Sequence, residues 1–268
     1  MRGYLSIGIV ILGLITGGCK ESAAAARQRF LKTLLENEFT QAARIVEEHP
    51  ELATATDDQG NAVLPFCLDR APASFIELLL KHGANASSPQ TCAVMPTFVA
   101  SKSSDPQILE VLLAKGLNAD SRDSRGATLL MHAVRASNRP MIAALVKHGA
   151  KLDACETGDM KFSVLHYAVM SCNVDTIKDM VARGAPLDLR DSEKETPLQL
   201  AIWASKESRS SSDQMDAFTA AANAGEIKDS RTLLTEGLLI AKRGAYGNWQ
   251  LRRDFQPVIA ALREAGAK

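Results

Sequence analysis

The stretch Leu145-Val146-Lys147-His148-Gly149-Ala150 decides the fold, because close variants of it recur at a nearly constant spacing. Each variant is an apolar run that ends in a glycine. The glycines of this series are Gly83, Gly116, Gly149 and Gly184, which lie 33, 33 and 35 residues apart. A spacing of this size is typical of a chain built from internal structural repeats.

A second series, of small residues, keeps the same phase. One small residue lies 16 positions before each glycine of the first series. The members of this second series are Cys67, Ala100, Ala133 and Ala168, and Ala201 continues it. Two independent markers thus hold one phase over more than 130 residues, which chance does not explain.

Each marker has a physical role in a pair of helices. The residues before each glycine are apolar at helical spacing, as in Ile142, Leu145 and Val146. The glycine suits a left-handed helix cap, where a Cβ atom would clash. The small residue suits a place where two neighbouring helices approach closely. We therefore predict an all-α fold, helical in antiparallel pairs over residues 27–268. The connecting loops are expected at 53–61, 86–94, 119–127, 152–161 and 187–195.

One predicted helix starts with Thr196-Pro197-Leu198-Gln199-Leu200-Ala201, and Thr128 and Ser163 begin weaker copies of this string. Threonine suits the N-cap and proline the first helical position. From about Gly60 to Ala201 the chain resembles the ankyrin repeat, in which Thr-Pro-Leu-His-x-Ala precedes a second helix ending in Leu-Leu-x-x-Gly-Ala. The resemblance implies an all-α ankyrin-repeat solenoid of helix-turn-helix units at 27–205, with irregular C-terminal repeats and a cap at 206–268.

The N-terminus has the pattern of an export signal. Leu5 to Thr16 is apolar, which is short for a spanning helix of roughly 20 residues and suits a signal-peptide core. The string Ile15-Thr16-Gly17-Gly18-Cys19 resembles the lipobox of bacterial lipoproteins, although Thr16 stands where leucine is commonest. The resemblance implies a signal peptide at 1–18, a lipidated Cys19 and a short tether over 19–26.

The residue after the cysteine bears on the location. Lys20 stands where lipoproteins retained in the inner membrane typically carry Asp. By resemblance, the expected location is the outer membrane, with the repeats facing the periplasm. The alternative is ordinary cleavage within Ala23–Ala26, which would give a soluble periplasmic or secreted protein.

The remaining cysteines invite a disulfide interpretation in an oxidising compartment. The repeat pattern places Cys67 in a helix and Cys172 at the far end of another, with Cys92 and Cys155 in loops. At roughly 1.5 Å per helical residue, Cys155 and Cys172 would lie about 15 Å apart, too far to bridge. A Cys67–Cys92 pair stays open.

The sequence gives no support for catalysis, a cofactor or a metal centre. It lacks the phosphate-binding, hydrolase-elbow and zinc-protease motifs, and no CxxC pair occurs. The formal net charge is zero, with no long run of like charge, so nothing favours nucleic acid as a partner. We therefore expect a binding protein and not an enzyme.

Histidines and acidic loops receive structural interpretations. His166 occupies the histidine place of the Thr-Pro-Leu-His element, and His82 and His148 precede capping glycines. His132 is expected on the exposed side of its helix. The acidic loops at 57–61 and 120–126 match turn chemistry and not a calcium-binding loop.

The candidate binding surface is a stripe on the first helix of each pair, facing the concave side. It is defined by the residue before each small marker and those two or three places after it. The candidate contact residues are Phe66, Arg70, Lys102, His132, Arg135, Tyr167, Met170 and Trp203, with Arg125, Asp159 and Lys194 as a polar rim. Such residue types are enriched at interface hot spots. Phe66 and Trp203 could instead pack against neighbouring repeats.

The expected function is a membrane-anchored periplasmic scaffold that binds another protein on its concave face. A different class is an immunity lipoprotein, which would inhibit a toxic effector such as a lipase that acts in the periplasm. By resemblance to other bacterial ankyrin proteins, a catalase-associated accessory role in oxidative stress is a third interpretation. Gene neighbours distinguish the second from the first, because an immunity gene lies beside its toxin gene.

Overall fold

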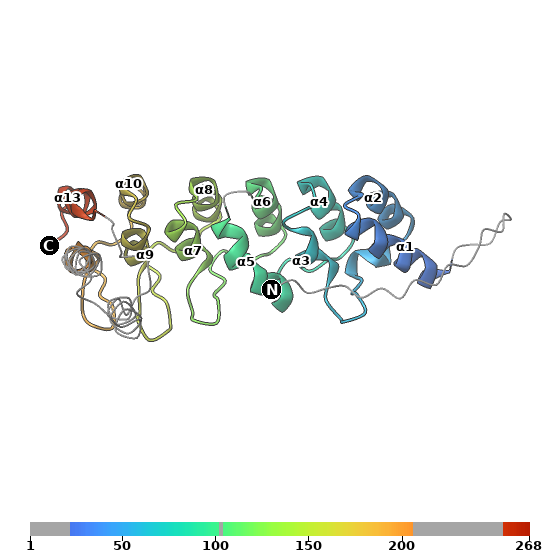
Figure 1. The fold of residues 1–268 in the computed structure, drawn as a ribbon, viewed down its shortest axis with the longest axis horizontal. Helices are drawn as coiled ribbons and strands as arrows, with labels where there is room; N and C mark the ends of the chain where they lie inside the picture. The colour runs from blue at the N-terminus through green and yellow to red at the C-terminus, as the bar shows by residue number, and fades with distance from the viewer. Residues whose placement is uncertain (1–21, 102–103, 206–253) are drawn as a thin grey trace, which may run out of the picture. The chain divides into compact units, whose positions relative to one another are not determined.

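The computed structural model describes residues 22–101, 104–205 and 254–268 (Figure 1). These residues form α-helices, one short 3-10 helix and connecting loops. Their only β-structure is three isolated antiparallel bridges, at Thr56–Ala62, Arg122–Thr128 and Cys155–Ser163. The predicted all-α fold of paired helices is confirmed. No helix in the described ranges combines the length and apolar character that crossing a membrane requires.

Contacts divide the chain into two units, residues 1–98 with 103–118 and residues 99–102 with 119–268. The first unit is a series of helix pairs in which α2, α4 and α6 form one row and α1, α3 and α5 the other (Figure 1). Its elements are α1 (Ala23–Leu35), α2 (Phe39–Glu48), η1 (Pro50–Thr54), α3 (Val63–Cys67), α4 (Ala73–Lys81), α5 (Pro89–Ala100) and α6 (Pro106–Ala114). The last two residues of α5 cluster with the second unit.

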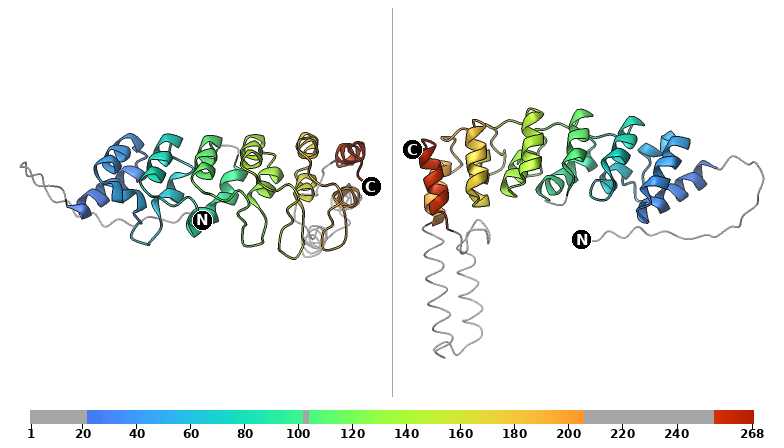
Figure 2. Two further views of the ribbon diagram at one scale, coloured as in Figure 1. Left: turned by 180° about the vertical axis from the view of Figure 1, so that it is seen from behind. Right: turned by 90° about the horizontal axis from the view of Figure 1, so that it is seen from above.

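The second unit continues the same pattern of pairs. Its elements are α7 (Leu129–Arg135), α8 (Arg139–Lys147), α9 (Val164–Ser171), α10 (Val174–Ala182), a helix over 197–205 and α13 (Gln256–Glu264). Helix α7 packs on α8 and α9, and α10 packs on α9 and α13. Helices α8, α10 and α13 lie side by side in the view from above (Figure 2). Much of the predicted C-terminal region, residues 206–253, lies outside the described residues.

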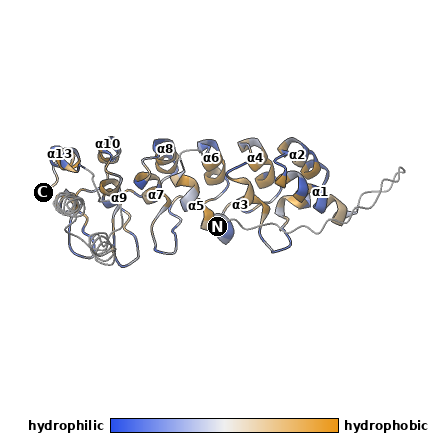
Figure 3. Ribbon diagram, in the orientation of Figure 1, coloured by the Kyte–Doolittle hydropathy of each residue, from blue (hydrophilic) through white to orange (hydrophobic). Residues whose placement is uncertain are grey.

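Most members of both sequence markers have the predicted places in the core, although Ala100 is only half-buried. The small residues Cys67, Ala133, Ala168 and Ala201 are fully buried. The apolar positions before the glycines are buried as well, with Leu79, Leu112 and Leu145 each 0% exposed. Burying one such side chain contributes roughly 1.5–3 kcal/mol. Apolar residues therefore concentrate on the helices, whereas the hairpin loops are polar (Figure 3).

The repeated glycines adopt the predicted left-handed conformation. The φ angles of Gly83, Gly116, Gly149 and Gly184 are 98°, 99°, 84° and 93°. The amide of Gly149 donates to the carbonyl of Val146, and the amide of Ala150 donates to that of Leu145, so the turn closes helix α8. A residue with a side chain is strained in this conformation.

Gly149→Val is therefore expected to lower the free energy of unfolding by about 1 kcal/mol or more. No atom lies within 4 Å of the Cβ that a side chain would add there, so backbone strain is the main cause. Urea denaturation of the variant measures the loss. Ala143→Val, at an exposed position of the same helix, controls for the β-branched side chain, and equal losses in the two variants would contradict the cap assignment.

The start of α5 corrects one predicted loop. Residues 86–94 were expected to form a loop, but the helix begins at Pro89. The Oγ atom of Ser88 accepts from the amide of Thr91 at 3.1 Å, and Pro89 follows at the first helical position. This N-cap and proline start the helix before the repeat pattern would. Cys92 consequently lies in a helix, not in a loop.

The start of α1 moves the predicted boundary at residue 27. Ser22 caps the helix by accepting from the amide of Ala25 at 3.2 Å, and the helix begins at Ala23. Ala26 is fully buried. Residues 23–26 therefore belong to the first helix and not to a tether.

The four described cysteines are free thiols, so Cys67 and Cys92 are not joined in this structure. Cys67 is fully buried. Burial raises the pKa of its thiol to about 12, so the thiol stays protonated and unreactive at neutral pH.

Candidate protein-interaction surface

The hairpins before α3, α7 and α9 each carry an acidic residue directly after the first residue of their antiparallel bridge. Asp123 lies nine positions before His132, and Asp57 lies nine before Phe66. Glu156 lies eleven positions before Tyr167, because that hairpin is two residues longer. His132, Phe66 and Tyr167 share one place, immediately before the small buried residue of their helix. In the hairpins before α7 and α9, the loop acid and the residue at this helix position are in direct contact.

Asp123 organises its hairpin through backbone bonds. Its Oδ1 atom accepts from the amides of Arg125 and Ala127, both at 2.9 Å. Asp57 and Asp191 make the same pair of bonds in their own loops. The predicted turn chemistry of the Asp57 and Asp123 loops is confirmed. Burial alone would raise the pKa of Asp123, but these amides and His132 outweigh burial and lower it.

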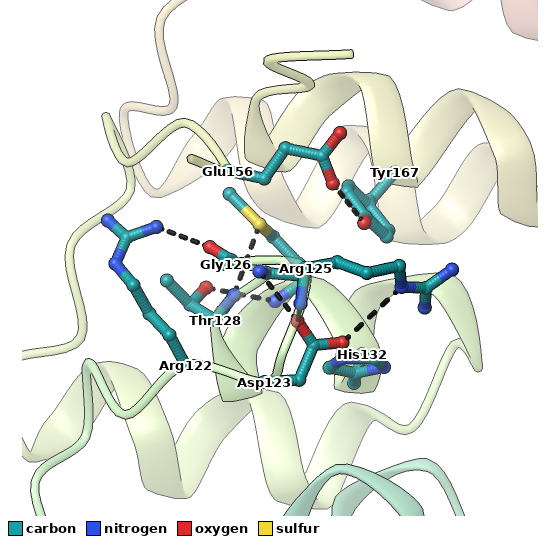
Figure 4. A network of polar contacts seen from close by, with 10 residues as sticks. Arg122, Asp123, Arg125, Gly126, Thr128, His132, Glu156 and Tyr167 are labelled. Carbon is teal, nitrogen blue, oxygen red and sulfur yellow. Dashed lines mark hydrogen bonds and ion pairs between the residues drawn. The ribbon is translucent and has the colours of Figure 1, made fainter. Parts of the chain in front are cut away.

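His132 completes this arrangement. Its Nε2 atom lies 3.0 Å from Oδ2 of Asp123 (Figure 4). The His132 side chain is only 12% exposed, so the prediction that it lies on the exposed side of its helix is wrong. Burial lowers the pKa of His132. The histidine holds the hairpin against α7 and offers little surface to a partner.

Tyr167 makes the equivalent contact in the next repeat. Its hydroxyl donates to Oε2 of Glu156 at 2.6 Å (Figure 4). Tyr167 is 4% exposed and Glu156 is 7% exposed. Burial, followed by the hydrogen bond to Glu156, raises the pKa of Tyr167 well above its usual value. Met170 is also buried. Tyr167 and Met170 are therefore parts of the core, and their predicted place on an open contact surface is wrong.

The hairpins before α7 and α9 are packed on each other. Arg122 donates from its guanidinium to the carbonyl of Gly126 and to that of Cys155, the latter at 2.8 Å. A Cβ atom on Gly126 would meet Oγ1 of Thr157 at 1.9 Å, so the two loops touch directly. Polar contacts thus form a network in these hairpins and the adjoining helices (Figure 4).

The first unit instead carries an open apolar groove of about 420 Å³. Helices α1, α3 and α5 and the hairpin before α3 form its walls. The groove is lined by Leu31, Leu34, Leu35, Asp57, Gln59, Asn61, Ala62, Val63, Pro65, Phe66, Gln90, Ala93 and Val94. Among the described residues, Val94 is the large hydrophobic side chain that is exposed, at 37%. An exposed apolar surface of this kind suits a binding partner.

One predicted contact residue lines this groove, and a second stacks on the first. Phe66 is half-buried and lines it. The Arg70 guanidinium stacks over the Phe66 ring, 4.7 Å from its centroid. Such a stack holds the arginine in place while its charge stays exposed. Phe66 and Arg70 thus form one accessible pair.

The other predicted contact residues are dispersed. Arg125, Arg135, Asp159 and Lys194 are exposed, and Trp203 is half-buried. Arg125 also pairs with Asp123 at 3.6 Å. Lys102 and Cys19 lie outside the described residues.

Comparison with known proteins identifies the repeats. A family model for "Ankyrin repeats (3 copies)" matches residues 66–156 and 97–191. The putative ankyrin repeat protein FPV031 of fowlpox virus (strain NVSL) is 30% identical over 150 residues, which cover 53% of this chain and 43% of that protein. Neurogenic locus notch homolog protein 1 of Xenopus tropicalis is 27% identical over 202 residues, or 75% of this chain and 8% of that protein. The chain thus spans less than half of the viral protein and under a tenth of the notch homolog.

Solved structures show the same fold. The human ASB11 ankyrin repeat domain superposes with a TM-score of 0.53 at 22% identity, over 64% of this chain and 75% of that one. EF0377, an ankyrin repeat protein, gives 0.53 at 17% identity, over 65% of this chain and 90% of that one. At these identities the likeness concerns the fold alone.

Proposed function

Because residues 66–191 match the ankyrin-repeat family model, we propose that the chain acts by binding another protein and catalyses no reaction itself. Ankyrin repeats generally mediate protein–protein interaction and are typically not enzymes. The observation that carries the proposal for this chain is the groove of the first unit, which leaves apolar side chains open beside Phe66 and Arg70. A partner that covers these side chains gains the free energy of burying them.

A capture experiment tests protein binding. The tagged chain from residue 20 onward, which keeps every described residue, is incubated with periplasmic extract, and the product of the neighbouring gene is tested alongside. We expect one protein to be enriched by about tenfold or more over bare resin. An Arg70→Ala chain should retain less of it, because this change removes the side chain that stacks on Phe66. If no protein is enriched above the level on bare resin, protein binding is contradicted.

We further propose that Cys19 is lipidated and anchors the repeats to the outer membrane on its periplasmic side. The apolar run from Leu5 to Thr16 followed by Gly17-Gly18-Cys19 supports this location. The start of α1 gives separate support. Cleavage within Ala23–Ala26 would cut into a helix that Ser22 caps and in which Ala26 is fully buried. Two or more acyl chains hold a protein stably on a bilayer.

Cys19→Ala is expected to move the protein from the membrane fraction to the soluble periplasm, or to leave it as an unprocessed precursor. The lipid is attached to the cysteine, so the variant has no acceptor for it. Fractionation followed by mass spectrometry of the N-terminus measures both results. Ser22→Ala serves as the control, since it changes a neighbouring residue and leaves the cysteine. Normal maturation and unchanged membrane partition of Cys19→Ala would refute the anchor.

A further inference from the structure

The groove of the first unit arises where one repeat departs from the common pattern. Helix α7 begins at Leu129, and the equivalent residue one 33-residue period earlier is Pro96. Helix α5 begins instead at Pro89, seven residues before that place. Among the described residues, the hairpins before α3, α7 and α9 each close with an antiparallel bridge, and no such bridge precedes α5. The extra helical turns of α5 stand where other repeats carry a polar hairpin.

The first turn of α5 is fixed in this place. Gln90 donates from Nε2 to the carbonyl of Gly60 at 3.2 Å and accepts at Oε1 from the amide of Ala62 at 3.3 Å. One side chain therefore ties the turn to the neighbouring hairpin through a donated and an accepted bond. Ala93 and Val94, on the next turn, are left exposed at the groove.

The opposite wall and the floor are also apolar. Helix α1 contributes Leu31 and Leu35, both half-buried. Leu34 and Val63 are buried beneath them. A volume of about 420 Å³ falls within the range of roughly 300–1,000 Å³ that is usual for binding pockets. The groove is thus preformed and large enough to take several side chains.

The groove lining carries one negative charge, while the Arg70 guanidinium, which stacks on Phe66, is not part of the lining. Asp57 is the one charged residue among the described residues that line the groove. Burial alone would raise the pKa of Asp57, but hydrogen bonds from Asn61 and Gln59, with help from Arg27, outweigh burial and lower it. Arg27 itself bonds to the carbonyl of Thr56 and to Asp58, and it does not line the groove.

Asp57 also has room for a further donor. Its Oδ1 atom accepts two backbone amides, whereas Oδ2 accepts the Asn61 side chain at 2.9 Å. A carboxylate has about four acceptor positions, so a cation from a partner can add to these bonds.

We propose that this groove binds an amphipathic helix of the partner protein, with large aliphatic or aromatic side chains on the buried face and a Lys or Arg beside Asp57. The inference rests on the proposed protein-binding function and specifies the chemistry of the partner. The apolar face of the partner helix packs against the walls formed by α1 and α5. Asp57 favours a partner that carries a positive charge at this point.

Synthetic peptides test this chemistry with the chain from residue 20 onward. The probe is a fluorescent peptide of about 18 residues, roughly five helical turns, made of Leu and Lys with Leu on one face. Its two comparison peptides are a scrambled version without an apolar face and a version with Glu in place of Lys. We expect the first peptide to bind about tenfold or more tightly than either comparison, as measured by fluorescence anisotropy.

Substitutions locate the binding in the groove. Val94→Glu is expected to weaken binding of the Leu/Lys peptide by about tenfold or more. Thr97→Glu adds the same charge at an exposed position of α5 outside the groove lining and should leave binding unchanged. Asp57→Asn should abolish the preference for Lys over Glu peptides while binding of the apolar face persists. Circular dichroism of each variant confirms that the helices are retained.

Several results would overturn the groove proposal. Equal binding of the scrambled peptide, or an equal effect of Val94→Glu and Thr97→Glu, is one of them. Concentration-dependent dimerisation that Val94→Glu prevents would identify a second copy as the occupant. Tighter binding of a peptide of residues 1–21 would identify the chain's own N-terminus. Undiminished capture of the natural partner by Val94→Glu would overturn the groove and leave protein binding standing, whereas no capture by the parent chain would overturn protein binding itself.

Discussion

Gly126→Ala is expected to lower the free energy of unfolding by about 3 kcal/mol, since two independent costs add. The φ angle of Gly126 is 79°, a conformation that strains a residue with a side chain. The added Cβ would also lie 1.9 Å from Oγ1 and 2.7 Å from the backbone nitrogen of Thr157. A backbone atom cannot rotate away as a side chain can, so the hairpins before α7 and α9 would have to separate.

Gly149→Ala is the matched control for this change. Its φ angle of 84° is nearly the same, but no atom lies within 4 Å of the added Cβ. We expect a loss of about 1 kcal/mol from strain alone. Urea denaturation of the two variants and the parent gives both losses. The difference between them isolates the packing of the hairpins, and equal losses would show that the loops do not touch in solution.

The helix pairs and their glycine caps could be predicted because their causes are local and repeated. Gly149 and Gly184 end helices through their own backbone conformation, and the pattern of leucines fixes which face of each helix is buried. The start of α5 was missed because its cause, although local, does not recur at the repeat spacing. The 33-residue period placed a loop at 86–94, whereas Ser88 and Pro89 begin a helix there, with the cap seven residues before the position equivalent to Thr128.

The candidate site was harder to predict, because exposure depends on what folds over a residue. Helical spacing places Phe66, His132 and Tyr167 at one equivalent position. Phe66 lines an open groove, whereas the hairpin acids Asp123 and Glu156 cover His132 and Tyr167. The sequence did contain one signal that these two side chains are covered. An acidic residue lies nine positions before His132 and eleven before Tyr167, and both side chains can form a hydrogen bond with it.

The groove itself had no signal in the repeat pattern. It depends on the early start of α5, which brings Ala93 and Val94 opposite α1. The repeat spacing predicts only features that recur in every repeat, and this helix start occurs in one. The lipidation of Cys19 stays a prediction, since that residue lies outside the described part of the chain.

Tyr167→Phe is expected to lower the free energy of unfolding by about 2 kcal/mol, although it removes a single oxygen atom. The Tyr167 hydroxyl is the hydrogen-bond donor to the Glu156 carboxylate, and both residues are buried. Without that donor, the carboxylate remains desolvated and unsatisfied. Tyr167 is therefore expected to contribute mainly to stability. Loss of a residue that only contacts a partner would instead weaken binding and leave stability unchanged.

The companion variant Tyr167→Phe/Glu156→Leu tests the cause, because replacing both partners by apolar groups removes the unsatisfied carboxylate. We expect it to recover about half of the lost stability or more, as measured by urea denaturation. The pH dependence gives a second test. Since the folded state raises the pKa of Tyr167, the unfolded chain loses this proton first, and the parent loses stability as the pH rises above about 10. Tyr167→Phe has no such proton, so its deficit relative to the parent should shrink over that range. A deficit that is constant with pH and unrelieved by Glu156→Leu would show that the pair does not stabilise the fold through its hydrogen bond.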